Sequence, residues 1–200
     1  MPSGGTIQFD RTEALEAAIS IFWEKGYEAT GLAELLERMG IGRQSLYNTF
    51  GDKRSLFEQA LSHYYKTRIT RFQQVIEGNA SPLEGVRAIL RMIESHNTSG
   101  NGLGCLVINS IAESGAFDAE MKTLLRDKLK KLEAIFKSAL TRAKEANELR
   151  ADTDTRALAR ALVSTAFGTT LMGRVGVSKA MVADVIRMNQ KMLDAYAMGR

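Results

Sequence analysis

The scarcity of proline limits this chain to a few kinds of fold. Its 200 residues contain only two prolines, Pro2 and Pro82, and clusters of β-branched residues are scarce. Because an internal proline breaks a helix, a chain with so few can form long uninterrupted helices. Apolar residues recur at helical spacing, as Leu15, Ile19 and Phe22 do near the start. We therefore predict an all-α fold of nine helices, three of them short and most of the others long.

Capping residues predict where these helices begin and end. Asp10 is placed to cap the first helix, Gly26 to end it, and Thr30 to cap the second helix. Gly40 and Gly42 then form a turn. Further caps and breaks predict the later helices at 43–49, 53–77, from 82 onwards, 105–111, 118–147, from 155 to about 172, and 179–198.

Length and charge narrow the class of protein. The chain is long enough for one large domain, or for a small domain fused to a medium one. Its net charge of +4 permits a polyanionic partner, although the first fifty residues carry more acidic than basic side chains. Any nucleic-acid contact in that region must therefore rest on a few well-placed hydrogen-bond donors.

Cysteine use and apolar runs exclude other classes. Cys105 is the only cysteine, which excludes an intrachain disulfide scaffold. Residues 1–6 lack the basic start and apolar stretch of a signal peptide, and no apolar run approaches the length of a membrane span. We expect a cytoplasmic protein with no membrane partner.

The segment 30–56 carries the most informative motif. Two short helices joined by a glycine-containing turn are typical of a helix-turn-helix, whose second helix can enter the major groove of DNA. Leu46, Tyr47 and Phe50 are the apolar anchors of that second helix. Arg and Gln pair with guanine and adenine edges, and hydroxyls and lysines bond phosphates. The predicted DNA contacts are Thr30, Arg43, Gln44, Ser45, Tyr47, Asn48, Thr49 and Lys53.

This block resembles the TetR family of bacterial regulators. The resemblance covers roughly the first quarter of the chain and departs from the family at two positions. Gly42 stands where a Ser or Thr cap is usual, and Gln44 replaces a commonly small residue with a longer side chain. The motifs that carry the resemblance are the run 25–30, Phe22, Leu35, the run 39–43, the run 46–50, Lys53 and Leu56.

The resemblance implies a second, helical domain with a small-molecule pocket and a dimer interface. We therefore predict a three-helix DNA-binding domain at 1–52 and a six-helix regulatory and dimerisation domain at 53–200. The predicted function is a DNA-binding transcriptional regulator, a repressor, that leaves palindromic operator DNA when a small-molecule effector or an electrophile acts on it.

The last two long helices are the candidate dimer interface. They are rich in small and apolar residues, which suits close packing into a four-helix bundle between two copies. The alternative is that these faces pack only within their own domain. The predicted interface residues are Ala161, Ser164, Gly168, Val185, Met188 and Met192.

Candidate effector contacts are spread over several predicted helices. The candidates are His63, Tyr64, His96, Cys105, Phe136 and Phe167, although aromatics at helical spacing are more often plain core. Cys105 follows Gly104, and some TetR-type repressors of electrophile and oxidant defence carry a Gly-Cys-Leu at a similar place. A thiol at a helix start would be reactive, whereas the alternative is an inert cysteine buried beside Leu106 and Val107.

Other functional classes remain as alternatives. The chain could be a helical small-molecule-binding protein or an enzyme without DNA binding, a protein adaptor, or a chain in which 30–56 is only a packed hairpin. It lacks the Gly-x-Ser-x-Gly, His-Glu-x-x-His and Gly-Lys-Ser/Thr motifs, and Gly100, Gly102 and Gly104 do not have dinucleotide-binding spacing. Two histidines and one distant cysteine make a metal site unexpected. We expect no enzymatic activity and no cofactor.

Overall fold

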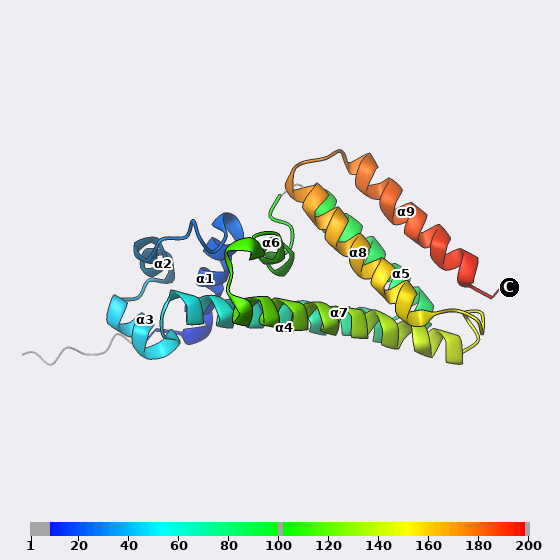
Figure 1. Cartoon of the computed structure of the whole chain (residues 1–200), viewed down its shortest axis with the longest axis horizontal. Coiled ribbons are helices and arrows are strands. Elements are labelled where there is room, and N and C mark those ends of the chain that lie inside the picture. The colour runs from blue at the N-terminus through cyan, green and yellow to red at the C-terminus, as the bar shows by residue number, and fades with distance from the viewer. Residues whose placement is uncertain (1–8, 100–101, 199–200) are drawn as a thin grey trace, which may run out of the picture. The chain divides into compact units, whose positions relative to one another are not determined.

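Helices make up the regular structure of this chain. The structure, a computed structural model, describes residues 9–99 and 102–198. Over these ranges it contains nine α-helices and one 3-10 turn, which confirms the all-α prediction (Figure 1). Residues 1–6, which lack signal-peptide features, lie outside the described residues. So do Gly100 and Asn101 of the glycine-rich loop.

The helix bounds follow the predicted order. None of the helices in the described residues is long and apolar enough to cross a membrane. The elements are α1 (Arg11–Lys25), α2 (Leu32–Met39), α3 (Arg43–Phe50), α4 (Lys53–Glu77), α5 (Pro82–Thr98), α6 (Leu106–Ala112), η1 (Ser114–Ala116), α7 (Ala119–Glu145), α8 (Thr155–Arg174) and α9 (Lys179–Tyr196).

Side-chain caps fix most of the helix starts. Asp10 accepts hydrogen bonds from the backbone N–H groups of Thr12 and Glu13 at 2.7 and 3.0 Å, which confirms it as the first cap. Ser81 precedes Pro82 and accepts from the N–H of Glu84 at 3.1 Å. These bonds satisfy amides that the first turn of a helix leaves without a partner, so they set where each helix begins.

The chain forms two compact units, Met1–Tyr64 and Tyr65–Arg200, here called the N-terminal and C-terminal units. Their boundary lies within α4, whereas the sequence suggested a boundary between residues 52 and 53. The mostly aliphatic core of the N-terminal unit includes an aromatic pair: Phe22 and Phe57 are no more than 1% exposed, and their ring centroids lie 4.8 Å apart.

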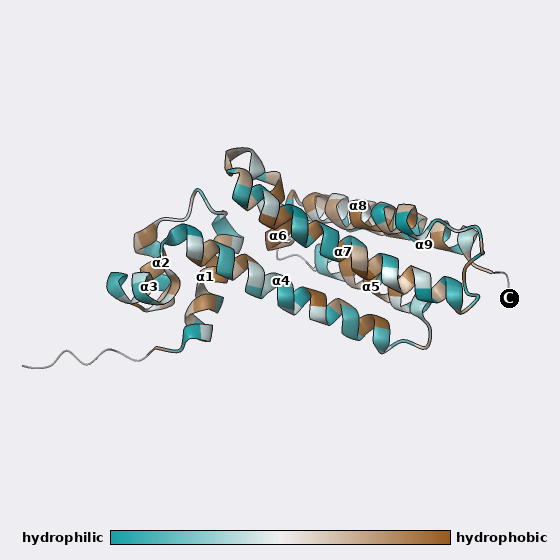
Figure 2. Cartoon of the chain, turned by 60° about the horizontal axis from the view of Figure 1, so that its bottom comes forward, coloured by the Kyte–Doolittle hydropathy of each residue, from teal (hydrophilic) through white to brown (hydrophobic). Residues whose placement is uncertain are grey.

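In the C-terminal unit, the core lies among α5, α7, α8 and α9. Figure 2 shows polar and apolar residues alternating along α7, as an amphipathic helix requires. Arg87 of α5 anchors α9, because its guanidinium lies 2.7 Å from the Asp194 carboxylate and Gln190 Nε2 donates to the Arg87 carbonyl at 3.2 Å.

Candidate nucleic-acid interface

A tight turn sets the position of α3 against α2. Gly40 adopts the left-handed conformation at φ 65°, which a residue with a side chain rarely tolerates, and its N–H bonds to the carbonyl of Glu37. The chain then passes through the buried Ile41 to Gly42, which precedes α3 and provides no side-chain cap. The predicted turn between the two short helices, and the weak cap at Gly42, are both confirmed.

The inner face of α3 holds the helix on its unit. Leu46 and Phe50 are 0% and 2% exposed, as predicted for apolar anchors. Tyr47 is not a third anchor: its side chain is 47% exposed. The reason is its register, because the residue directly after Leu46 is rotated by about 100° around the helix axis and points outward.

The outer face of α3 presents polar side chains together. Arg43, Gln44, Tyr47 and Asn48 are exposed, whereas Ser45 and Thr49 are half-buried. Gln44 Nε2 donates a hydrogen bond to Asn48 Oδ1 at 2.9 Å. Arg43 carries the only charge on this helix. This face is therefore a set of neutral donors and acceptors with one cation, a suitable surface for base edges and phosphates.

The structure corrects the prediction for Thr30. The cap position of α2 is Gly31, not Thr30. The Thr30 side chain is 1% exposed, and its hydroxyl donates to the carbonyl of Gly26 at 2.6 Å. That bond satisfies a carbonyl near the end of α1, so the hydroxyl stabilises the turn between α1 and α2. A pattern of Thr before an apolar run cannot distinguish this role from a cap.

Lys53 lies at the start of α4, immediately after Asp52, whose carboxylate accepts from the N–H of Ser55 at 2.7 Å. The Lys53 ammonium lies 4.5 Å from the centre of the Tyr27 ring, a cation–π contact. Burial raises the pKa of Tyr27, so this ring stays neutral beside the lysine. Because the ring carries no charge, it positions the Lys53 ammonium at the start of α4 without forming an ion pair with it.

Two acidic residues of the N-terminal unit, Glu24 and Glu34, form ion pairs between α1 and α2. Arg38 of α2 forms hydrogen bonds of 3.2 Å to both oxygens of Glu24 on α1, and the pKa of that carboxyl is lowered chiefly by this bond. Lys25 pairs with Glu34. The excess of acidic side chains noted in the sequence therefore does not place a carboxylate on α3 itself.

The six candidate effector residues are divided between the two units. His63 and Tyr64 belong to the N-terminal unit, where His63 Nε2 lies 2.8 Å from Glu16 and the Tyr64 ring packs on Trp23. The other four, His96, Cys105, Phe136 and Phe167, belong to the C-terminal unit. There Phe136 is fully buried in the hydrophobic core, whereas Phe167 and Cys105 are half-buried.

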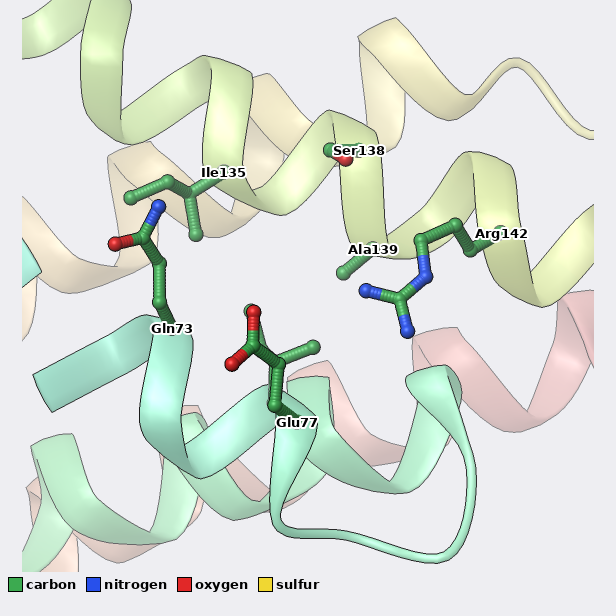
Figure 3. Close-up of a pocket in the computed structure, with 7 residues that line it drawn as sticks. Gln73, Glu77, Ile135, Ser138, Ala139 and Arg142 are labelled. Carbon is green, nitrogen blue, oxygen red and sulfur yellow. The ribbon is translucent and has the colours of Figure 1, made fainter. Parts of the chain in front are cut away.

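A groove lies between α4 and α7 within the C-terminal unit. Figure 3 shows Gln73 and Glu77 of α4 facing Ser138 and Arg142 of α7 across it. Its volume of about 100 Å³ is below the roughly 300 Å³ of ordinary small-molecule sites, so it has room for little more than a small fragment.

The candidate dimer residues lie on two matching stripes. Ser164, Gly168 and Met188 are exposed, and Ala161 and Val185 are half-buried. Met192 is also half-buried, but it packs against the core of its own unit. The stripe on α8 continues through two residues that the sequence analysis missed, Leu171 on the helix and Val175 immediately after it, which are 38% and 78% exposed. They lie three and seven residues after Gly168, and this helical spacing was the available signal.

Comparisons with known proteins agree with this arrangement. Residues 14–60 match the bacterial regulatory proteins of the tetR family, and residues 82–188 match the tetracyclin repressor-like C-terminal domain. The HTH-type transcriptional regulator YezE of Bacillus subtilis is 34% identical over 96% of this chain and 100% of its own. The HTH-type transcriptional repressor ComR of Escherichia coli is 27% identical over 85% of this chain and 82% of its own.

A solved structure extends the likeness to the whole fold. The transcriptional regulator CifR, as a cysteine mutant complexed with 26-bp double-strand operator DNA, superposes with a TM-score of 0.81 at 30% identity. The match covers 96% of this chain and 100% of that chain. The helix-turn-helix, the all-helical second unit and these relatives together show that the chain belongs to the TetR family of DNA-binding transcriptional regulators, a family of non-enzymatic proteins.

Proposed function

We propose that this regulator is a homodimeric repressor that binds palindromic operator DNA through α3 of each copy. The observation that carries the proposal is the outer face of α3, where Arg43, Gln44, Tyr47 and Asn48 are exposed together. Lys53, held by the Tyr27 ring, supplies a phosphate contact. A two-fold dimer presents this face twice, which fits half-sites one helical turn of DNA apart.

The exposed stripes of α8 and α9 support the dimer. Small residues at Ala161, Ser164 and Gly168 allow close approach of a second helix, and Met188 supplies apolar area beside them. The relatives support the mode of action, since CifR is bound to operator DNA and ComR is a repressor by name.

The test is a measurement of operator affinity on duplexes selected from a random 26-bp library by the full-length protein. Arg43→Ala should cost about 1–3 kcal/mol and relax the base preference at one position in each half-site. Lys53→Ala should weaken binding to all sequences. It should also reduce the slope of log K against log salt concentration by about one, as expected for the loss of one phosphate contact. Lys130→Ala, on α7, is the control. If both variants bind like the control, α3 is not the reading helix.

We further propose that an effector acts in the C-terminal unit, close to Cys105. Cys105 immediately precedes α6, and the adjacent Gly104 is closely packed: a Cβ added there would lie 3.1 Å from Thr170 of α8. His96 of α5 lies 2.9 Å from the Gly104 carbonyl, and burial lowers its pKa, favouring the neutral ring. We expect added bulk on the half-buried Cys105, next to this closely packed glycine, to displace α5, α6 or α8, because a packed interior cannot absorb it.

Two measurements test this regulation. Iodoacetamide alkylates a thiol, forming an S–C bond with loss of iodide, and it should release operator DNA from the parent protein and not from Cys105→Ser. No release would remove the electrophile mechanism. A metabolite panel then tests a reversible effector, which must weaken DNA binding by the same factor by which DNA weakens effector binding. A compound that binds without this reciprocity is not the inducer.

A further inference from the structure

The bond between Gln44 and Asn48 uses one of the two N–H donors of a reading side chain. These residues are one helical turn apart, both are exposed, and Gln44 Nε2 donates to Asn48 Oδ1 at 2.9 Å. A glutamine amide has two N–H donors and one carbonyl oxygen. The bond to Asn48 occupies one donor, so Gln44 is left with one N–H and Oε1.

That remaining pair matches one purine and opposes the other. In the major groove, adenine presents the N7 acceptor beside the N6 amino donor, whereas guanine presents two acceptors, N7 and O6. One N–H and one carbonyl oxygen therefore fit adenine with two hydrogen bonds. Guanine would require two N–H donors. The one N–H that remains on Gln44 can bond to only one of the guanine acceptors, and Oε1 would then face the other acceptor and repel it.

We propose that Asn48 is a positioning residue that makes Gln44 specific for adenine in each half-site. The proposal rests on the function proposed above, in which α3 reads the operator. Asn48 fixes the plane of the Gln44 amide before DNA binds. Because Asn48 accepts one of the two N–H groups, Gln44 cannot donate the two hydrogen bonds that guanine requires. Asn48 has this effect without touching the base itself.

The position of the pair on α3 favours this role. Gln44 is the second residue of the helix, and residues near the start of a reading helix are the ones that reach base edges. Asn48 lies one turn further from that end, where it can support Gln44 from behind. Arg43, the neighbouring reader, has no such bond to Asn48 among the described contacts and keeps its full set of donors.

The experiment measures adenine-versus-guanine discrimination at one base pair. The full-length parent selects duplexes from a random 26-bp library, and Gln44→Ala then identifies the base pair that loses its preference. Binding constants are measured on duplexes with adenine or guanine at that pair for the parent, Asn48→Ala, Asn48→Asp and the double variant of Gln44→Ala with Asn48→Ala. Circular dichroism verifies that each variant folds.

We expect the parent to prefer adenine by roughly 5- to 150-fold. Asn48→Ala should lose most of that preference, and Asn48→Asp should keep it, because a carboxylate still accepts from Nε2, while its charge weakens binding to every duplex. In the Gln44→Ala background, Asn48→Ala should cause no further change in the adenine-versus-guanine preference at this base pair.

Three results would overturn the assignment: a parent preference for guanine at that pair, an Asn48→Ala variant that keeps the adenine preference, or one that alters only another base pair. A parent that selects no sequence at all would instead refute DNA reading by α3. The two failures are therefore distinguishable.

Discussion

The two units of the molecule differ in how many of their large apolar side chains are exposed. In the described part of the N-terminal unit, Tyr47 is the single large hydrophobic residue that is strongly exposed, and it lies on the reading face of α3. The C-terminal unit leaves a series exposed on and next to its last two helices, including Val175 at 78%, immediately after α8, and Met188 at 59%. A scattered exposed residue needs no explanation, but stripes on neighbouring helices indicate a surface that another protein covers.

The two cores explain part of this difference. The N-terminal unit has a cluster of aromatic rings within its core, where Phe22 and Tyr27 both pack against Phe57, with centroids 4.8 Å from it. Each such side chain buries about 150–250 Å², so a small unit can complete its core alone. The C-terminal unit uses aliphatic side chains on long amphipathic helices, and α8 has apolar residues on more than one side. The C-terminal unit, unlike the described part of the N-terminal unit, therefore leaves several large apolar residues on its surface.

The largest effect should come from a charge on the exposed stripe of α8. A Cβ at Gly168 would meet no described atom within 4 Å, so Gly168→Glu is tolerated by a single chain. In a dimer the carboxylate would be buried without a partner, which costs roughly 3–5 kcal/mol, or more than 100-fold in association. Sedimentation should detect monomers, and operator affinity should fall because the two reading helices are no longer linked.

Gly115→Glu is the matched control for this variant. Its site is also exposed in the C-terminal unit, and a Cβ there meets no described atom within 4 Å. It should stay dimeric with parental operator affinity. If Gly168→Glu also stays dimeric, the stripes are not the interface, and the contrast between the two units needs another explanation.

The sequence predicted what depends on short-range chemistry. Asp10 caps the first helix as predicted, and Asp52 and Ser81 cap later helices in the same way, because a cap bonds only to amides two or three residues away. The turn at Gly40 was predicted for the same reason. The fold class and the helix-turn-helix therefore follow from local patterns, with the family resemblance as a second line of support.

The sequence could not predict which partner an individual side chain contacts. Thr30 bonds backward to Gly26 instead of capping α2, and Met192 packs inward although it shares a stripe with Met188. The pairing of Gln44 with Asn48 has helical spacing, but a spacing alone does not say that two polar side chains will bond to each other. These outcomes depend on rotamers and on neighbouring helices, which composition and periodicity do not record.

Lys128 is an unusual charge in the interior of the C-terminal unit. It shares a face of α7 with Leu125 and Leu132, at spacings of three and four, and is only 7% exposed. Its ammonium lies 5.2 Å from the centre of the Tyr65 ring, and the Tyr65 hydroxyl donates to the Lys128 carbonyl. Burial, and secondarily the nearby Lys131, lower the pKa of Lys128 to about 8.

This lysine predicts a smaller, pH-dependent effect confined to the C-terminal unit. Between pH 8 and the ordinary lysine value of 10.5, the unfolded chain binds a proton that the folded chain has lost, so the free energy of unfolding rises with pH across that window and falls as pH drops toward 8. The slope is at most about 1.4 kcal/mol per pH unit. Lys128→Met should lack this slope in urea unfolding between pH 8 and 9.5, followed by circular dichroism. Lys130→Met, whose side chain is 75% exposed in the parent, should keep the parental profile. Parallel profiles for Lys128→Met and the parent would mean that the buried amine keeps its proton in this range, stabilised by contacts within its unit.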